Sequence, residues 1–576
     1  MEGLSNVSIA PEQGRHPRSA ERTQGCVSVA DLGEAGPAAQ AQRHKEQCFS
    51  FGRMNEATAL ATVTVQDDCK LGGGSWSAPY SDIIRLIIDH LKIVDRWRWE
   101  GRALRLTNRT WCRTINQCIT EVKPHESRAT TMCDVVEASS KFKGVHSVDL
   151  SGCTGRCTEE SFGGLLGLAH LTTVRLSGLC VTDSGMPMLA KSPSIKHLSL
   201  IKVMVTDMGL GAVGKMEQLE SLELKGLDFI TSAALGSVSG VSTLKVVLCT
   251  LVTDEGMTKL GSYENLVDLT VMLVAVGDAG ISVVMDLTKL TRLTLLCHNS
   301  TGAGLSKISQ LASLKELSLR EMEDIDLPIG ICKLTSLRQL SMYKSNKICG
   351  EDLECIMSMN LTSLRLYGMD KVQRTDLTRV AKMGSLMELG IGQMNIVRSA
   401  DLGSLCALTC LTKLNLQRCH NIGNTGVALL TRLTNLRELF LHNCDRVGRR
   451  GVEYLVPLQH LEKLTVGPNM DDACVSVISL MPNLRQLGFV LCNDLTVGGL
   501  RPLRRMARLR DLCLDWCNVF ATSGSREFKA LAKLFFIDLD HVGLHPFRLT
   551  DDIIRQIRQI APPLKVDSNV TWVWEW

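Results

Sequence analysis

Residues 436–441 read Leu436-Arg-Glu-Leu-Phe-Leu441, and this spacing of leucines recurs along the chain from about Val145 to about Leu539. Side chains alternate between the two faces of an extended strand, so Leu439 and Leu441 point to one face and Phe440 points to the other. One copy is too short to bury its own leucines, and neighbouring copies must therefore stack. The pattern predicts a parallel sheet with one continuous core behind it.

The copies follow one another at a regular interval. Their first apolar residues are seventeen positions about 24 residues apart, namely Val145, Leu171, Ile195, Leu219, Val241, Leu266, Leu290, Leu314, Leu337, Leu361, Leu386, Leu411, Leu436, Leu461, Leu484, Leu509 and Leu534. A sustained period in the twenties is typical of a solenoid. With strands about 4.8 Å apart, seventeen units predict a curved sheet on the order of 80 Å long.

The second half of many copies contains a turn motif, Val-Thr-Asp-x-Gly. It is clearest at 181–185, 205–209 and 252–256. Thr or Asp in this place can cap the first amides of a short helix, and the apolar residues that follow can pack back on the sheet. Each unit is therefore predicted to be a strand, a turn and a short convex helix. The copy at 324–328 lacks the motif and is expected to return by an extended or 3₁₀ segment.

Cysteine recurs three residues after the last leucine in several copies. It does so at Cys153, Cys249, Cys419, Cys444, Cys492 and Cys517. Together with the leucine spacing, this position resembles the cysteine-containing subtype of leucine-rich repeat proteins. The resemblance implies an α/β horseshoe with a parallel concave sheet, convex helices, and these cysteines inside the coil near turning backbone.

The composition limits the classes of function and the compartment. A net charge of +4 is too small to indicate a nucleic-acid-binding protein. Most of the 22 cysteines are expected to be buried free thiols, with disulfides or a metal site as the less favoured readings. The chain shows neither a secretory signal nor an apolar run long enough to span a membrane, so we expect a cytoplasmic or nuclear protein.

Changes in composition divide the chain into four parts. Residues 1–76 are predicted to be a disordered arm, 77–122 a small helical module, 123–544 the solenoid and 545–576 a C-terminal cap. The cap is expected to contain a helix that opens at 549–553, followed by a tail in which Val and Trp alternate with polar residues over 570–576.

The helical module carries a second resemblance. Ala78-Pro79, Asp82, Ile84, Ile87, Leu91 and Leu106-Thr-Asn-Arg109-Thr-Trp111 follow one another in the order typical of an F-box, the module that docks on the Skp1 subunit of cullin-RING ubiquitin ligases. Ala78 replaces the usual leucine, and the link from Leu91 to Trp111 is longer than usual. The resemblance implies docking residues Pro79, Ile84, Ile87, Leu91 and Trp111. The alternative reading is a plain helical cap on the first repeat.

No arrangement typical of an active site stands out in the sequence. Gly72-Gly-Gly74 lacks the Gly-Lys-Ser/Thr of a phosphate-binding loop, and no Ser/His/Asp order or metal motif is recognisable. We therefore expect a protein that is not an enzyme and needs no cofactor or metal. A basic run of Arg501, Arg504, Arg505 and Arg508 is interpreted as a solvated convex face, with an acidic partner or nucleic acid as the alternative.

The repeat predicts which side chains line the concave face. Most are small or polar, but an apolar and basic set stands out: Val247, Met272, Leu296, Arg320, Tyr343, Arg365, Tyr367, Phe440 and His442. Exposed aromatic and Arg clusters are typical of partner hot spots, so this set is the predicted partner-binding surface. The alternative interpretation is that these are tolerated apolar surface residues or that the strand register is misjudged.

The predicted function is a non-enzymatic interaction protein, namely a substrate adaptor of a cullin-RING (SCF-type) ubiquitin ligase that holds its target on the concave face and docks on a Skp1-like subunit. The alternative function is a regulatory scaffold similar to leucine-rich repeat regulators of cyclases or small GTPases, with no ubiquitin link.

Overall fold

The computed structural model describes residues 181–323 and 325–517 without a break, together with 121–122, 136, 139, 144–151, 153, 162–178, 519, 541–544 and 565–567. All described residues belong to the unit Leu71–Trp576.

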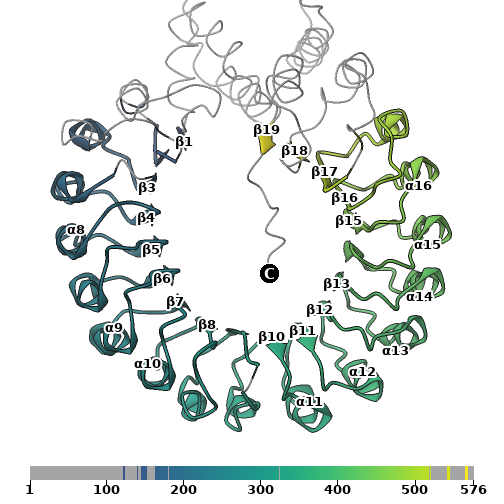
Figure 1. Ribbon diagram of the computed structural model, residues 1–576, viewed down its shortest axis with the longest axis horizontal. Coiled ribbons are helices and arrows are strands. Elements are labelled where there is room, and N and C mark those ends of the chain that lie inside the picture. Colours follow the sequence, from purple (N-terminus) through teal and green to yellow (C-terminus); the bar gives the residue numbers. More distant parts are fainter. Residues whose placement is uncertain are drawn as a thin grey trace, which may run out of the picture. The chain divides into compact units, whose positions relative to one another are not determined.

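Parallel strands follow one another along the sheet in chain order (Figure 1). Each strand pairs with the next one in sequence. The strands are β1 (Glu121–Val122), β2 (Ser147–Asp149), β3 (Thr173–Ser177), β4 (His197–Ile201), β5 (Ser221–Lys225), β6 (Thr243–Val247), β7 (Asp268–Met272), β8 (Arg292–Leu296), β9 (Glu316–Arg320), β10 (Gln339–Ser345), β11 (Ser363–Met369), β12 (Glu388–Gly390), β13 (Lys413–Asn415), β14 (Glu438–Phe440), β15 (Lys463–Val466), β16 (Gln486–Val490), β17 (Asp511–Asp515), β18 (His541–Leu544) and β19 (Lys565–Asp567).

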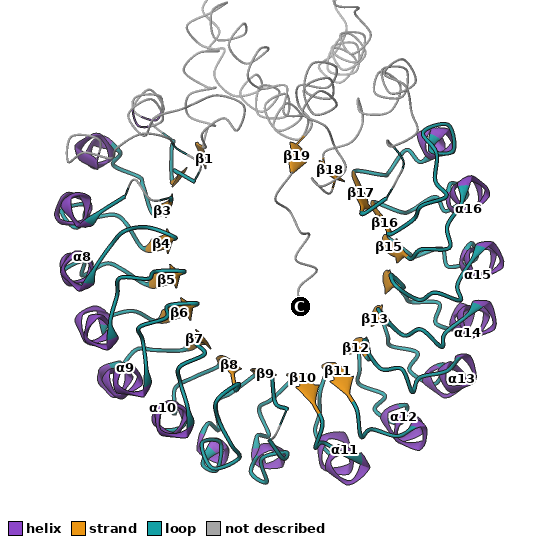
Figure 2. Cartoon of the chain, viewed as in Figure 1, coloured by secondary structure: helices purple, strands orange, loops and turns teal. Residues whose placement is uncertain are grey.

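The helices of the solenoid lie on the convex side of this sheet (Figure 2). The α-helices are α7 (Met186–Leu189), α8 (Asp207–Val213), α9 (Asp254–Lys259), α10 (Asp278–Val284), α11 (Gly350–Met357), α12 (Arg374–Val380), α13 (Leu402–Leu405), α14 (Asn424–Leu429), α15 (Arg449–Leu455) and α16 (Asp472–Ile478). The 3₁₀ segments are η4 (Gly164–Gly167), η5 (Asp183–Gly185), η6 (Ser232–Val238), η7 (Leu260–Ser262), η8 (Ile308–Gln310), η9 (Ile331–Lys333), η10 (Ser399–Asp401), η11 (Leu430–Arg432) and η12 (Arg501–Arg505).

The extended or 3₁₀ return predicted at 324–328 is confirmed in its described part. Residues 325–328 are neither helix nor strand, and the chain reaches β10 through η9. The preceding return, between β8 and β9, also contains 3₁₀ structure but no α-helix, which the sequence reading did not single out.

The predicted register of the leucines is confirmed. Leu439 and Leu441 are both fully buried at 0% exposure and belong to the continuous core. From β2 to β17, each strand begins two residues after a predicted anchor. This agreement follows from side-chain alternation, because a shift by one residue would expose every leucine at once.

The two ends of the sheet differ from the sequence pattern. β1 lies at the end of the segment predicted as a helical module, and β19 lies inside the predicted C-terminal cap. The copy predicted at Leu534 would place a strand at 536–540, which is outside the described residues, and β18 follows at His541–Leu544. Strands this short and poor in leucine lack the signature that marks the others. The residues predicted as a disordered arm (1–76), as a helix from 549 and as a tail (570–576) also fall outside the described part.

The turn motif links neighbouring repeats in addition to capping helices. Thr206 caps α8 through its side chain, as predicted, but Asp183 accepts hydrogen bonds from the Thr206 backbone N–H and hydroxyl at 2.8 and 2.6 Å. Asp278 binds Thr301 of the next repeat in the same way, at 2.7 and 2.6 Å. Stacking brings equivalent turns side by side, so this aspartate spans two repeats. The sequence analysis predicted the cap but not this link between repeats.

The recurring cysteines also connect repeats. The Sγ atoms of Cys419, Cys444 and Cys492 donate to carbonyl oxygens of the preceding repeat over 3.2, 3.1 and 2.8 Å. Cys249 and Cys517 make similar contacts at 3.7 and 3.4 Å. These five thiols lie buried beside turning backbone, as the pattern predicts, whereas Cys153 is only half-buried.

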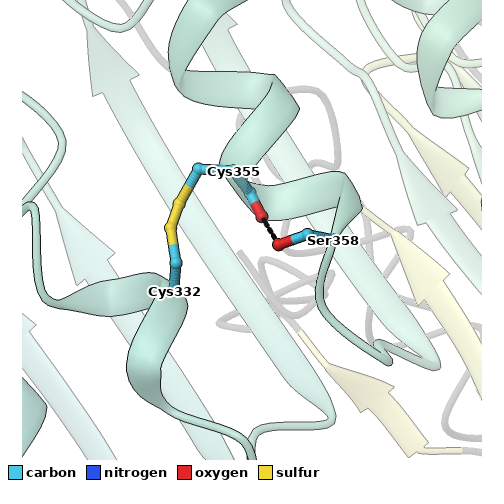
Figure 3. Close-up of a disulfide and its surroundings, with 3 residues drawn as sticks. All are labelled: Cys332, Cys355 and Ser358. Atoms are coloured by element: carbon cyan, nitrogen blue, oxygen red, sulfur yellow. Dashed lines mark hydrogen bonds between the residues drawn. A yellow bond between two sulfur atoms is a disulfide. The ribbon is translucent and has the colours of Figure 1, made fainter.

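One cysteine pair departs from the expectation of free thiols. Cys332 in η9 and Cys355 in α11 form a disulfide between adjacent convex segments, with their Cα atoms 5.8 Å apart (Figure 3). The residues are 23 positions apart, about one repeat, so stacking places them opposite each other. The sequence alone could not show this, because many cysteine pairs share a similar spacing.

Candidate functional site

The aromatic and charged members of the predicted binding set lie on the concave face between β8 and β15. Strand register aligns Arg320 of β9 with Tyr343 of β10, and Tyr343 with Tyr367 of β11. The Arg320 guanidinium carbon lies 4.7 Å from the centre of the Tyr343 ring. The two tyrosine rings stack with centroids 5.1 Å apart and planes 7° from parallel. We call these three residues the aromatic ladder.

Beyond Tyr367, the ladder meets two glycines of the next repeat. A Cβ atom added to Gly390 of β12 would lie 2.6 Å from the Tyr367 hydroxyl oxygen, and one added to Gly392 would lie 2.8 Å from its ring. The ring of Tyr367 therefore rests on bare backbone, an approach that only glycine permits.

The aromatic rings are less accessible than the sequence predicts. Tyr343 is 8% exposed and Tyr367 is 4% exposed, and burial raises the pKa of the Tyr367 hydroxyl. Both tyrosines lie on the concave side and outside the leucine core cluster, as expected, but the prediction that they stand open to solvent is wrong. Large side chains on strands about 4.8 Å apart cover one another.

An ion-pair cluster lies directly beside the ladder. Arg365 donates to Glu388 Oε1 from Nη2 at 2.8 Å and from Nε at 3.0 Å. The Ser363 hydroxyl donates to Glu388 Oε2 at 2.8 Å, and Lys413 Nζ lies 3.1 Å from Oε1. Burial by itself would raise the pKa of the Glu388 carboxyl, but Arg365, Lys413 and Ser363 outweigh it and hold this pKa below its usual value. The cluster is thus charged and held in place at neutral pH.

A second aromatic group begins one strand further on. The Phe440 ring of β14 lies between two ammonium groups, with Lys413 Nζ at 5.7 Å and Lys463 Nζ at 5.3 Å from its centre. His442 is buried nearby, and its Nδ1 lies 3.1 Å from the Thr465 hydroxyl. Burial first, and then the charge of Arg418, lower the pKa of His442 to about 4, so this ring is neutral at pH 7.

The remaining predicted residues extend the surface toward β6. Val247 and Met272 are aligned in register and half-buried, while Leu296 of β8 is buried and aligned with Arg320. Phe440 and Leu296, like the tyrosines, are less exposed than expected. The register thus gives an aligned row from Leu296 of β8 to Tyr367 of β11 and an aligned pair on β6 and β7, whereas Phe440 and His442 belong to a separate group near β14.

Sequence reasoning missed the charged members of the site. Four consecutive strands, β12 to β15, begin with an aligned charged residue, namely Glu388, Lys413, Glu438 and Lys463. Acidic and basic residues alternate at this position from one repeat to the next. This alternation in the sequence could have predicted the cross-strand ion pairs.

The other candidate residues lie elsewhere. Arg501, Arg504 and Arg505 are exposed on η12, and Arg508 donates to Asn483 Oδ1 at 2.7 Å. The F-box-like residues Pro79, Ile84, Ile87, Leu91 and Trp111 fall outside the described residues.

In the described part of the chain, no three His, Cys, Asp or Glu side chains are grouped so that they could hold a metal ion. The helices described there include none that is long and apolar enough to cross a bilayer.

Comparison with known protein families agrees with this architecture. Residues 278–545 match a family model described as a leucine-rich repeat region. An internalin of Listeria monocytogenes is 19% identical, with a TM-score of 0.37, and the match covers 66% of this chain and 92% of that one. A leucine-rich repeat protein of Leptospira interrogans is 16% identical, with a TM-score of 0.34 and coverage of 74% and 96%. Mouse RP105, solved with MD-1, is 15% identical, with a TM-score of 0.36 and coverage of 73% of each chain. No curated protein matches the sequence. The fold is a leucine-rich repeat solenoid.

Proposed function

We propose that this solenoid is a non-enzymatic protein-binding module and that its partner lies on the concave face from β8 to β15. The observations that carry the proposal are the contacts within the aromatic ladder and those within the Glu388 cluster, which lie on the neighbouring strands β9 to β13. Leucine-rich repeat solenoids present extended concave surfaces of this kind to other molecules.

The physical advantage of this surface is that its side chains are already fixed. Arg320 stacks on Tyr343, and Arg365 is held by two hydrogen bonds to Glu388. Side chains that are immobile before binding lose little conformational entropy when a partner arrives. The buried rings provide a rigid floor, and the accessible contacts come from the half-buried side chains of Arg320, Arg365, Lys413 and Lys463. A partner with carboxylate and carbonyl acceptors on a convex surface fits this arrangement.

Site-specific photo-cross-linking tests the location of the partner. A benzophenone amino acid placed at Arg320 or Lys413 of the full chain should cross-link to protein partners in cell extract. The same group at Lys382, an exposed residue after α12, is the matched control. Equal partner yields at the concave and convex positions would remove the concave face as the binding site.

We further propose that the chain acts in the cytoplasm or nucleus as a substrate adaptor of a cullin-RING ubiquitin ligase. The support is the order of F-box-like residues in 77–122. In this role the module docks on a Skp1-like subunit while the concave face holds the target.

Purified Skp1 and the full-length chain provide the test of the adaptor role. Binding should be lost in Ile84→Asp and Leu91→Asp but retained in Arg320→Glu, which alters only the concave face. If wild-type protein does not bind Skp1, the adaptor role is excluded, and the regulatory scaffold becomes the better description of the same binding surface.

A further inference from the structure

A second surface of the solenoid lies on the turns that follow β4, β5 and β6. In each turn, one residue directly precedes a buried aliphatic side chain that enters the core. Met204, Phe229 and Leu251 hold this position in three consecutive repeats and are 41%, 50% and 51% exposed. Three large apolar side chains are thus presented to solvent at equivalent places.

Other repeats of the same molecule show that the fold does not require apolar residues here. The equivalent position is polar in most later repeats, at Asn299, Lys347, Lys371, Asn421, Arg446, Asn469 and Asp494, with Ala275 and the half-buried Ile396 as exceptions. The Asn299 amide donates to the Val274 carbonyl at 2.6 Å, and Asn421 donates to the Asn395 carbonyl at 2.6 Å. Asparagine at this position therefore ties one turn to the preceding one, and the repeats after β4 to β6 lack this bond.

Two neighbouring residues enlarge the apolar area. Leu248, which directly follows β6, is 56% exposed and has a left-handed backbone with φ of 54°. Most repeats with this conformation place glycine or a polar residue there, such as Gly226, Lys202 or Lys344. A leucine is disfavoured in it on both steric and solvation grounds. Val274, in the turn after β7, is also exposed. We call Met204, Phe229, Leu248, Leu251 and Val274 the rim patch.

The edge of the rim patch toward the sheet is basic. Lys202 directly follows β4, Lys225 ends β5 and Lys245 lies within β6, and all three are exposed. None of them has an ion-pair partner among the residues that the structure describes. Asp228 is an exposed acidic residue of the same turns, whereas Asp207 is engaged by Thr231. The surface is therefore an apolar strip bordered by unpaired positive charge.

We propose that the rim patch binds an amphipathic helix of a partner protein, with the acidic flank of that helix facing Lys202, Lys225 and Lys245. Adjacent repeats are about 4.8 Å apart at the strands, and one helical turn rises about 5.4 Å. A helix that runs across the repeats therefore places one apolar side chain, at i, i+4 and i+7, against each turn in succession. The rim patch itself lies on the turns, its basic border includes Lys225 and Lys245 of the sheet, and the proposal does not depend on the proposed function.

Display selection with the full chain tests this proposal. A library of 18-residue peptides is selected on wild-type protein and counter-selected on the triple variant Met204→Asn, Phe229→Asn and Leu251→Asn. These substitutions introduce the residue that other repeats carry, so they should preserve the fold. The enriched peptides should have apolar residues at i, i+4 and i+7 and an excess of Asp and Glu. Their affinity, measured by fluorescence anisotropy, should fall at least tenfold in the triple variant and in Lys202→Glu with Lys225→Glu.

Several outcomes would overturn the proposal. They are the absence of enriched peptides, enrichment of basic peptides, or equal affinity for wild type and the triple variant. The controls Ile396→Asn, at the same position of another repeat, and Leu480→Asn, on an exposed convex site, should leave the affinity unchanged. Self-association lost in the triple variant would assign the patch to a second copy of this chain. Binding to anionic phosphatidylserine vesicles through the patch would assign it to a membrane surface. Either result replaces the partner helix.

Discussion

The ring of Tyr343 stacks on the ring of Tyr367, 5.1 Å away and 7° from parallel, across two adjacent strands on the concave face. The Arg320 guanidinium lies over the Tyr343 ring. On the other side of the stack, Gly390 and Gly392 of the next repeat leave room for the Tyr367 ring. The stack therefore links the packing of four consecutive repeats. It is a structural element as well as part of the proposed binding surface.

Removing the Tyr367 ring should destabilise the solenoid. Tyr367→Ala should lower the free energy of unfolding by about 3 kcal/mol, the usual cost of truncating a buried aromatic side chain. Tyr367→Phe, which keeps the ring and its stack, should cost less than about 1 kcal/mol. Denaturant unfolding monitored by circular dichroism measures both. Equal stability of the alanine variant and wild type would show that the stack contributes nothing to packing.

Acidification should weaken the Glu388 cluster. The pKa of Glu388 is lowered in the folded protein, so its contribution to stability is fully present above the pKa of the unfolded chain, near 4.5, and is lost as pH falls through the lower folded value. Wild type should therefore be more stable than Glu388→Gln at pH 7, and the difference should shrink below pH 4.5. Urea midpoints measured from pH 7 to pH 3 give this comparison. A difference that does not change with pH would mean that the carboxylate charge is not the source of stability.

The cysteines should react with iodoacetamide at very different rates. Burial raises the pKa of Cys419 to about 12 and that of Cys297 to about 12, so little thiolate forms at pH 8. Cys410 is exposed and should be alkylated before the other cysteines that the structure describes. Mass spectrometry of the native and the urea-unfolded protein should show Cys419 labelled only after unfolding. Rapid labelling of Cys419 in the native state would contradict the buried position of this thiol.

The disulfide between Cys332 and Cys355 should be detectable and stabilising. Peptide mapping without reductant should yield the linked peptides, and a thiol reductant should separate them. Cys332→Ser should lower the free energy of unfolding by about 3 kcal/mol under non-reducing conditions, the value expected for a loop of this length. Adding reductant should bring wild type down to the level of the variant. A variant as stable as the oxidised wild type would exclude a stabilising role for the bond.

The aspartate that connects neighbouring turns should matter more than an exposed ion pair. Asp278 accepts from the Thr301 backbone N–H and hydroxyl and from the Gly304 N–H, so Asp278→Ala should cost about 1 kcal/mol. Asp286 lies on the same repeat, but its carboxylate makes only an exposed ion pair with Lys307, at 3.6 Å. Asp286→Ala should change stability by less than about 0.5 kcal/mol. Thermal unfolding of both variants distinguishes a bond between repeats from a surface charge effect.

The sequence by itself determined the repeat, the strand positions from β2 to β17, and the identity of the buried leucines. The reason is physical: alternation along a strand is strictly periodic, and a slip by one residue would expose the core of every repeat. Because the register is fixed by periodicity, the sequence also identified which residues line the concave face.

Only the tertiary structure decided how exposed those residues are and which partners they contact. The stack of Tyr343 on Tyr367, the approach of Tyr367 to Gly390 and the ion pair of Arg365 with Glu388 join residues of different repeats. Such contacts depend on the spacing of neighbouring strands. The repeat period of the sequence does not predict them for individual residues. The same holds for the disulfide of Cys332 with Cys355 and for the alignment of Met204, Phe229 and Leu251 along one edge. Each depends on stacking, which brings together residues that are about one repeat apart in the chain.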